Sequence, residues 1–470
     1  MKKVIGLVLI LLIVGVAAPF GFGFWADARL NAMLEDFNKG GMLDFTVIKT
    51  NKGWFTSSAI IEAELAGSLA SKYSKASEGG AVTPPKVVLK STIYHGPFPF
   101  MSGSFSLNPV IGLMDTQFIK DLDSEEPLIN LDYTVKTEFS LAGDSNVLLD
   151  IPEWTGPLGS KDNANVEWKG LSGSIKMAKG LKNTDLNITA PLLKITSDTA
   201  NLIVESLQMT SSSYIGIAGL SMGKADFSIA NIEFNDPAKS VVSIGNTSIK
   251  ADTSETGSNV NSEIAFNMAK LNIAGAEYGP AVFSMAFRNL EANAVARINE
   301  KMKEIQSQNI PKDQVGMMMG ATLMGELSNL LKQGPEIEIS ELSMASAVGK
   351  MTGNARVTVD TSKPELLSNP FLVKDAIVGE LDFSIPEELL VIMNMGIVKK
   401  ELKDANIDYS EDQLKAMAKS RVAKNMGGLV AANIFTKVGN MYQITASFEK
   451  GIPTVNGSVL AIPFGGAPAQ

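Results

Sequence analysis

Several stretches of this chain alternate between apolar and polar residues, the period of half-buried β-strands. The clearest is LDYTVKTEFSL at 131–141. One face of that strand would hold Leu131, Tyr133, Val135, Thr137, Phe139 and Leu141. The same period recurs at 224–234, 261–274, 281–287, 354–360, 378–385 and 442–451. Because strand follows strand without regular helical crossovers, the pattern predicts extended antiparallel sheets.

Two blocks interrupt the strands with a helical pattern. Residues 290–333 are charged and then methionine-rich, are broken near Pro311, and end at Gly334-Pro335, a helix stop signal. The second block covers about 385–437. Its expected capping boxes pair Ser384 with Glu387 and Ser410 with Gln413.

The N-terminus predicts a membrane anchor. It is apolar and uncharged from Val4 to Trp25, and these 22 residues reach roughly 33 Å as a helix, enough to cross a bilayer. Lys2 and Lys3 favour the cytoplasmic side, so the body should lie outside the cytoplasm. A short helix is expected to leave the membrane at 26–37, where apolar residues follow the helical period.

A cleaved signal peptide is the competing interpretation. Ala26-Asp27-Ala28 has the small-x-small form of a cleavage site, and Pro19 would shorten the apolar core of the segment. The full apolar run is longer than the roughly 7–15 residues of a signal peptide, which favours an uncleaved anchor. No second apolar run of spanning length occurs in the sequence, so a single pass is expected.

The expected fold class is α+β: an N-terminal transmembrane helix followed by an elongated, mostly antiparallel β body with two helical blocks. With 470 residues the chain is too long for one ordinary core. The expected division is a transmembrane signal anchor at 1–25, a β-rich periplasmic region at 26–289, and an α+β periplasmic region with the methionine-rich helix at 290–470.

Composition narrows the classes of function. The formal charge is −9 and no block of basic residues occurs, which argues against nucleic-acid binding. The chain has no cysteine, which excludes disulfides, thiolate catalysis and cysteine-ligated metals. The acidic stretch 121–127 lacks the spacing of a calcium loop. We therefore expect no metal and no cofactor.

Catalytic motifs are weak. His95, in STIYHGPFPF at 91–100, is the single histidine, and as a general base it would need a nucleophile and a carboxylate in reach. The following Gly96 and Pro97 make a turn the simpler interpretation. GLSMG at 219–223 matches the G-x-S-x-G nucleophile pattern around Ser221, but a strand follows where that pattern needs a helix. The sequence thus predicts a protein that is not an enzyme.

The methionine-rich helix is the one segment suited to an apolar ligand, because methionine adapts to irregular apolar shapes. The candidate ligand-facing residues are Met317, Met318, Met319 and Met324. The alternative is an ordinary helix that faces the core.

Several local sequences together resemble a known family. They are NKGWFTSSAIIEAEL at 51–65, YHGPFPF at 94–100, VEWKGLSGSI at 166–175, residues 335–359, and FEKGIPTVNGSVLAIP at 448–463. In this order they resemble the YdgA-like family of bacterial membrane-anchored proteins of unknown function. The resemblance implies a Gram-negative inner-membrane protein with a periplasmic body. It makes His95, Gly96 and Pro97 a family turn and carries over no catalytic residue.

The sequence favours two functions, and an enzyme comes third because it would need a cluster of carboxylates or of Ser and Lys that only the fold can reveal. The first is a non-enzymatic structural or interaction role in the cell envelope, with self-association as one form. The second is binding or transfer of a lipid or another hydrophobic ligand. An apolar groove left open to solvent would favour the second function, whereas fully packed inner sheet faces would remove its basis.

Overall fold

The computed structural model describes most of the chain. The described residues are 2–39, 43–66, 86–102, 109–119, 133–157, 164–236, 240–273, 275–307, 312–362, 373–405 and 407–460. Their side chains are described from residue 18 onward, except at 39, 100, 240, 306, 307, 312 and 313. The acidic stretch 121–127, the start of the strand expected at 131–141, and Pro311 lie outside these residues.

The chain divides into two compact units, each assembled from separate stretches. Unit 1 comprises residues 1–198, 205–225 and 297–322; unit 2 comprises 199–204, 226–296 and 323–470. The strands β11 (Asn201–Ile215) and β12 (Ser221–Asp236) each contribute residues to both units. The division expected near residue 290 falls inside unit 2.

Unit 1 begins with α1 (Lys2–Lys39), a single helix that continues through Pro19. The separate helix expected at 26–37 is therefore the C-terminal part of α1, because nothing breaks the helix at Trp25. Within the described residues, no helix is long and apolar enough to cross a membrane. Most of the predicted span, residues 4–17, lies outside the described side chains.

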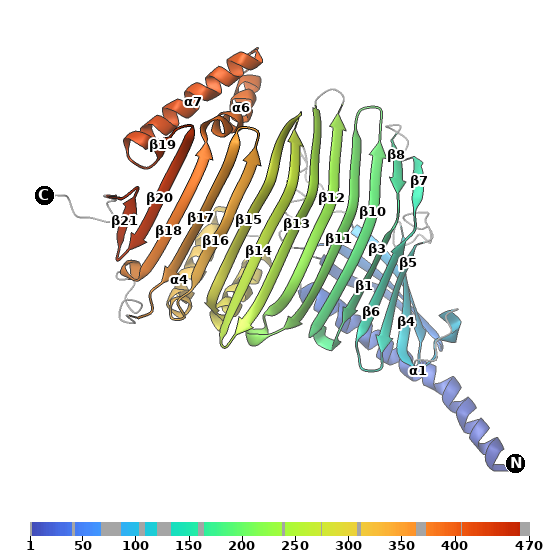
Figure 1. Cartoon of the computed structure of the whole chain (residues 1–470). Coiled ribbons are helices and arrows are strands. Elements are labelled where there is room, and N and C mark those ends of the chain that lie inside the picture. Colours follow the sequence, from blue (N-terminus) through green and yellow to red (C-terminus); the bar gives the residue numbers. More distant parts are fainter. Residues whose placement is uncertain are drawn as a thin grey trace. The chain divides into compact units, whose positions relative to one another are not determined.

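An antiparallel sheet forms the body of unit 1 (Figure 1). Its strands are β1 (Leu43–Lys52), β2 (Thr56–Leu65), β3 (Lys86–His95), β4 (Val110–Ile119), β5 (Thr134–Ser140), β6 (Ser145–Ile151), β7 (Trp154–Pro157), β8 (Asn165–Trp168), β9 (Leu171–Met177) and β10 (Asn183–Thr196). Strands β1 to β6 pair in sequence order, β6 then pairs with β9, and β9 pairs with β10. Strand β8 also pairs with β10, and β7 pairs with β8. The antiparallel strands expected from the alternating pattern are confirmed.

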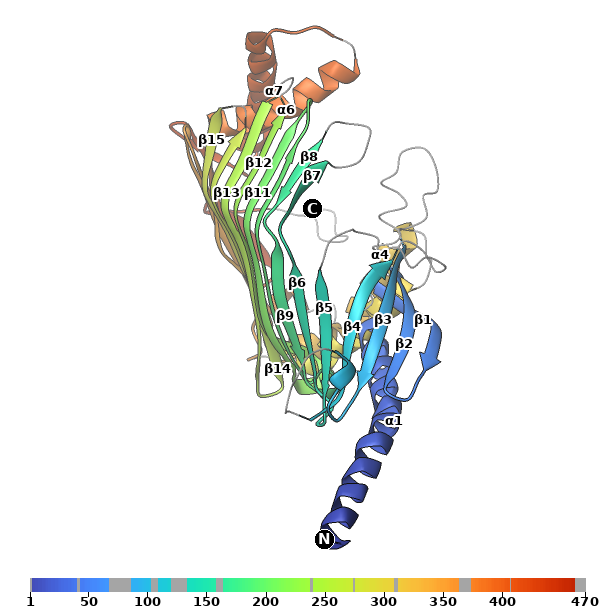
Figure 2. The ribbon, with the colours of Figure 1, turned by 90° about the vertical axis from the view of Figure 1, so that its right-hand side faces the viewer.

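The C-terminal half of α1 packs along the sheet of unit 1 (Figure 2). Its buried side chains recur at helical spacing and contact apolar residues that alternate along the strands. The core contains Ala26, Leu30, Met33 and Leu34 from α1 and Ile61, Ile93, Met114 and Phe139 from the strands. Phe139 is fully buried, on the face that the alternation of 131–141 predicted.

Unit 2 is built from further antiparallel strands together with helices. The strands are β13 (Ser240–Thr256), β14 (Asn259–Ile273), β15 (Ala276–Glu291), β16 (Glu336–Ser346), β17 (Gly349–Val359), β18 (Ile377–Pro386), β19 (Thr436–Val438), β20 (Met441–Glu449), β21 (Ile452–Val455) and β22 (Ser458–Val459). The helices are α3 (Ala292–Ser307), α4 (Lys312–Leu331), α6 (Glu387–Asp404) and α7 (Glu411–Ala431). Both helical blocks expected from the sequence are therefore present, and α3 and α4 also contribute residues to unit 1.

Helices α6 and α7 form a hairpin with its own apolar core against the sheet of unit 2. Ser410 caps α7 in the expected capping box with Gln413. The box expected at Ser384 is wrong, because Ser384 still pairs with Gln443 in the sheet and α6 begins only after Pro386, which offers no side-chain cap.

Gly23 should be required where α1 meets the sheet. A Cβ added there would lie 2.7 Å from His95 Nδ1 and 2.9 Å from Nε2, whereas one at Gly21 would meet nothing within 4 Å. We expect Gly23→Ala to lower the free energy of unfolding by about 1–3 kcal/mol through overpacking. Gly21→Ala should raise it by up to about 1 kcal/mol through helix propensity.

Chemical unfolding of the full chain in a mild detergent, followed by circular dichroism, measures both variants. Equal effects of the two substitutions would contradict this packing of α1 on His95.

Candidate functional sites: a buried histidine junction and an apolar sheet face

The His-Gly-Pro turn closes the end of β3. The N–H of Gly96 donates to the carbonyl of Ile111 at 2.9 Å, and a Cβ at this position would overlap the carbonyl oxygen of Val110. Glycine is thus required for close backbone approach, not for an unusual φ. Pro97 accepts a hydrogen bond from the N–H of Val110 at 2.9 Å. The turn therefore joins β3 firmly to β4.

His95 itself is a buried hydrogen-bonding centre. Its Nδ1 lies 3.1 Å from the carbonyl oxygen of Trp54, and its Nε2 lies 2.8 Å from Ser57 Oγ. Because a carbonyl only accepts, Nδ1 carries the proton and Nε2 accepts from the Ser57 hydroxyl. The backbone N–H of His95 also donates to the carbonyl of Phe55 at 2.8 Å. One residue thus fixes the turn between β1 and β2.

The contact between Ser57 and His95 has the geometry of a nucleophile with its base. However, Ser57 is 4 % exposed and His95 is 3 % exposed, and α1 lies over the imidazole ring at Gly23. A substrate carbonyl has no access to this hydroxyl. We interpret the group as a junction that joins α1, the β1–β2 turn and β3, and call it the His95 junction. No local pattern in the sequence points to Ser57, because its contact spans 38 residues along the chain.

The second site is one face of the sheet in unit 2. Residues paired across neighbouring strands point to the same face. On one face, the pairing of β13 through β18 to β20 brings apolar residues together in rows. This apolar face consists of Ile249, Phe266, Phe283, Leu342, Phe383 and Ile444 in one row, Ala251, Ile264, Met285, Ile339, Ala355, Leu381 and Ala446 in the next, and Phe287, Ile337, Val357 and Phe448 in a third.

The apolar face is covered at its ends and open between them. Phe383 packs against the α6–α7 core at one end, and Leu327 and Leu331 of α4 pack on Val359 at the other. In between, Ile249, Ile264, Ile337, Val357 and Leu381 are 37–46 % exposed. No charged side chain stands in the three rows.

The opposite face of the same strands is polar. Arg288 Nη1 donates to Glu336 at 2.6 Å and also to Glu338, and Arg356 Nε donates to Glu336 at 2.9 Å. Burial raises the pKa of the Glu336 carboxyl, but the hydrogen bonds from Arg356 and Arg288 outweigh burial and hold this pKa below its usual value. The two faces of the sheet therefore differ sharply in polarity.

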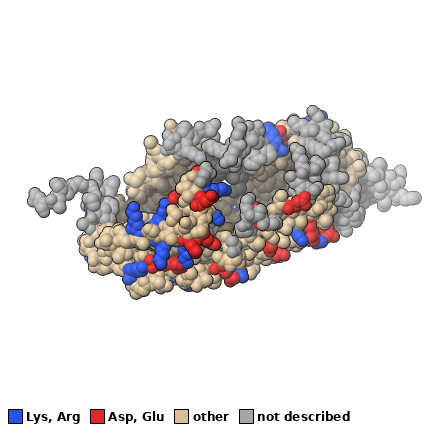
Figure 3. Space-filling model, turned by 90° about the horizontal axis from the view of Figure 1, so that it is seen from above, with Lys and Arg blue, Asp and Glu red and all other residues tan. Residues whose placement is uncertain are grey.

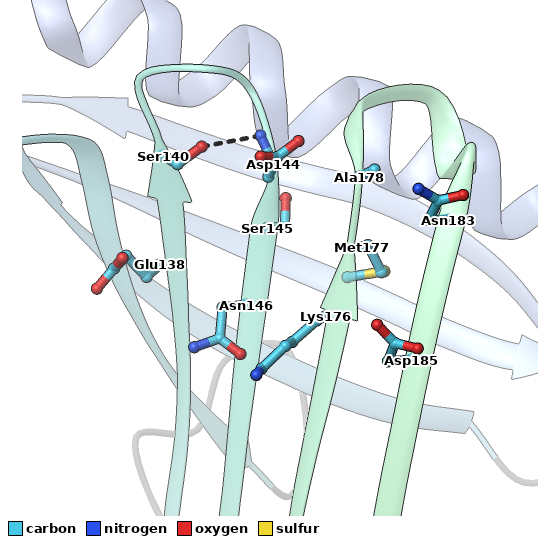
Figure 4. A pocket seen from close by; sticks show the side chains of 10 residues that line it. All are labelled: Glu138, Ser140, Asp144, Ser145, Asn146, Lys176, Met177, Ala178, Asn183 and Asp185. Atoms are coloured by element: carbon cyan, nitrogen blue, oxygen red, sulfur yellow. Dashed lines mark hydrogen bonds between the residues drawn. The ribbon is translucent and has the colours of Figure 1, made fainter. Parts of the chain in front are cut away.

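A polar hollow of about 340 Å³ lies in unit 1 across β5, β6, β9 and β10 (Figure 4). Glu138, Asn146 and Lys176 are among the residues that line it. Asp144 accepts from the N–H of Lys179 at 3.1 Å, and Asp185 accepts from Ser212 Oγ at 2.7 Å. In the described part of the chain, no three His, Asp or Glu residues are placed to hold a metal ion.

The remaining candidates are located as follows. Ser221 begins β12 after a short turn, so GLSMG joins two strands and does not form a nucleophile elbow. Met317 on α4 is 75 % exposed, Met318 and Met324 are also exposed, and Met319 is half-buried. Their role as ligand-facing residues stays a prediction. Figure 3 shows acidic and basic side chains interspersed on the face it presents.

Breaking the Ser57–His95 contact should destabilise unit 1. Ser57→Ala leaves Nε2 of a buried histidine without its donor, which costs about 1–3 kcal/mol. The matched control is Ser58→Ala, because Ser58 is the next residue on β2 and points to the other face. Chemical unfolding of the full chain compares them. Equal stability of the two variants would contradict the assigned role of Ser57.

The ion pairs of the polar face should make the stability of the folded protein sensitive to acid. Because the pKa of Glu336 is lowered by folding, its contribution to stability is present above its unfolded pKa and is lost as the pH falls through the lower folded pKa. We expect Glu336→Gln to flatten the loss of stability between neutral and acidic pH. In a double-mutant cycle the effect should shrink when Arg356 is replaced by Gln. Additive effects would contradict this coupling.

Comparison with known proteins gives one match. Residues 1–463 match the model of a family described as bacterial protein of unknown function (DUF945). Searches of curated proteins and of solved structures find no significant match. The YdgA-like name stays a prediction. The match covers nearly the whole chain, and the chain therefore belongs to this bacterial family, DUF945, of unknown function.

Proposed function

We propose that this protein is a single-pass protein of the bacterial inner membrane whose periplasmic body binds the acyl chains of a lipid, or another elongated hydrophobic ligand, on the apolar face of unit 2. The apolar run from Val4 to Trp25 and the two lysines before it support the anchor. The continuous helix α1 from Lys2 to Lys39 also supports it, because one helix leads from that run into the body.

The observation that carries the proposal is the open middle of the apolar face. Aliphatic side chains of this size are usually buried, and a large contiguous exposed patch marks a binding surface. Burying such a surface against an acyl chain contributes about 25 cal/mol per Å². A ligand that covers the face therefore gains binding energy without needing any polar contact.

The dimensions and chemistry of the face indicate the ligand class. Neighbouring strands lie about 4.8 Å apart, so the six steps from β13 to β20 span about 29 Å. This is about the hydrocarbon thickness of a bilayer, which two acyl chains fill end to end, so one acyl chain can lie within the face. The rows hold no charge to bind a headgroup, so the contacting part of the ligand is uncharged. A long acyl chain fits these requirements, with its headgroup outside the rows. The exposed Met324 of α4, which belongs to the same unit, is suited to such a ligand, because methionine adapts to variable apolar shapes.

The second candidate is the structural or interaction role in the cell envelope. It is supported by the same face, since an apolar sheet surface also suits a protein partner or a second copy of this chain. Both candidates are non-enzymatic. The two candidates differ in whether a lipid or a protein chain contacts Ile264 in the membrane-bound protein.

Site-specific crosslinking separates these candidates. The photoreactive residue p-benzoylphenylalanine replaces Ile264 in the full chain in bacterial cells, and the purified adducts are analysed by mass spectrometry. We expect lipid adducts, because Ile264 is exposed in the middle of the apolar face. The control is the same residue at Ala265, which follows on β14, faces the polar side opposite Lys250, and should give no lipid adduct.

Each result decides between the candidates. Lipid adducts at Ile264 alone support ligand binding. Adducts with protein chains at Ile264 support the interaction role. Equal lipid adducts at both positions, or none at Ile264, contradict the proposed ligand site. As a second readout, Ile264→Gln with Val357→Gln should reduce lipid that co-purifies, whereas Ala265→Gln with Thr358→Gln on the polar face should not.

A further inference from the structure

Unit 1 exposes a cluster of large apolar side chains at the end of its sheet where α1 emerges. Phe20, Phe24 and Trp25 lie on α1, Trp54 and Phe55 lie in the β1–β2 turn, and Phe98 and Met101 follow β3; all are exposed. Figures 1 and 2 both draw the loop after β3 beside the emerging helix. We call these residues the aromatic cluster. Three separate segments of sequence thus bring aromatic rings to one place.

Direct contacts join three members of the cluster, Phe20, Phe24 and Trp54. The rings of Phe20 and Trp54 stack with centroids 4.8 Å apart, and Phe20 meets Phe24 edge-on at 5.2 Å. Lys52 Nζ lies 4.6 Å from the centroid of the Phe24 ring and 2.8 Å from Asp27 Oδ2. Trp25 is 60 % exposed and Trp54 is 48 % exposed, so these contacts leave much of the aromatic surface open.

The His95 junction sets the geometry of the cluster. His95 holds the carbonyls of Trp54 and Phe55, and its ring packs on Gly23, one turn of α1 beyond Phe20. Phe98 follows in the same turn that Gly96 and Pro97 fix against β4. Hydrogen bonds therefore fix the backbone that carries Trp54 and Phe55, and those of Gly96 and Pro97 fix the turn that leads to Phe98.

We propose that the aromatic cluster inserts into the interfacial layer of the lipid bilayer, so that unit 1 rests on the membrane surface. Aromatic rings prefer the boundary between headgroups and acyl chains. The location supports this partner, because the apolar sequence of residues 4–17 continues directly from the cluster along α1. This inference rests on the proposed membrane anchor and deepens it. Unit 1 is then not suspended from a flexible tether but is held at a fixed depth and tilt.

Spin labels test this depth, because the chain has no native cysteine and any introduced cysteine is unique. Met101→Cys, Ile10→Cys and Glu153→Cys are each labelled with a nitroxide in the full chain, reconstituted in phosphatidylethanolamine–phosphatidylglycerol vesicles. Met101 is 66 % exposed, so a label there should not disturb the fold. Glu153 is exposed in the turn between β6 and β7, at the opposite end of the sheet of unit 1, and is the matched control.

The readout is collision of the label with oxygen, which concentrates in lipid, relative to a water-soluble nickel complex. We expect the ratio at Met101 to exceed the ratio at Glu153 several-fold and to lie below the ratio at Ile10. A water-like ratio at Met101 with a lipid-like ratio at Ile10 would overturn this inference but leave the anchor. A water-like ratio at Ile10 would overturn the anchor itself. Protection of Met101 from both reagents would indicate a protein partner and also overturn the inference.

Discussion

The structure depends on one constraint of antiparallel strands: alternate side chains point to opposite faces, so each sheet has an apolar face that needs a cover. Unit 1 meets the constraint with α1, whose buried stripe packs on Ile93 and Phe139. Unit 2 meets it only at the ends of the face, through the α6–α7 hairpin and the end of α4. Among the described residues, the middle of that face has no cover, and the proposed ligand follows from this difference.

The cover of unit 1 also carries the proposed membrane contact. A helix that leaves a domain without docking on it transmits no orientation. Here Gly23 lets α1 approach His95 closely, and His95 in turn binds the turn that presents Trp54. The same buried contacts thus fix the helix, the turn and the aromatic rings relative to one another. In the sequence His95 was a candidate catalytic base, but the structure favours a role in positioning the helix, the turn and the aromatic rings.

Local pattern was sufficient to predict most elements but not the sites. The strand around Phe139 and the cap at Ser410 follow from neighbouring residues, and both are present. The cap at Ser384 failed because pairing of β18 with β20 keeps Ser384 in the sheet, so a tertiary contact outweighs the local signal. Alternation showed that Phe266 and Phe283 face one side of their strands. Only the register across distant strands shows that they stand in one row with Leu342.

A sheet with an uncovered apolar face must hold its shape by other means. Long ladders of backbone hydrogen bonds contribute to this, since β13 and β14 pair along nearly their whole length. The polar face provides another part: Arg288 bridges Glu336 and Glu338, while Arg356 joins Glu336 from the next strand. These ties keep neighbouring strands in register without a packed layer on the other side. The apolar face is thereby left open for the proposed ligand, which a permanent structural layer would exclude.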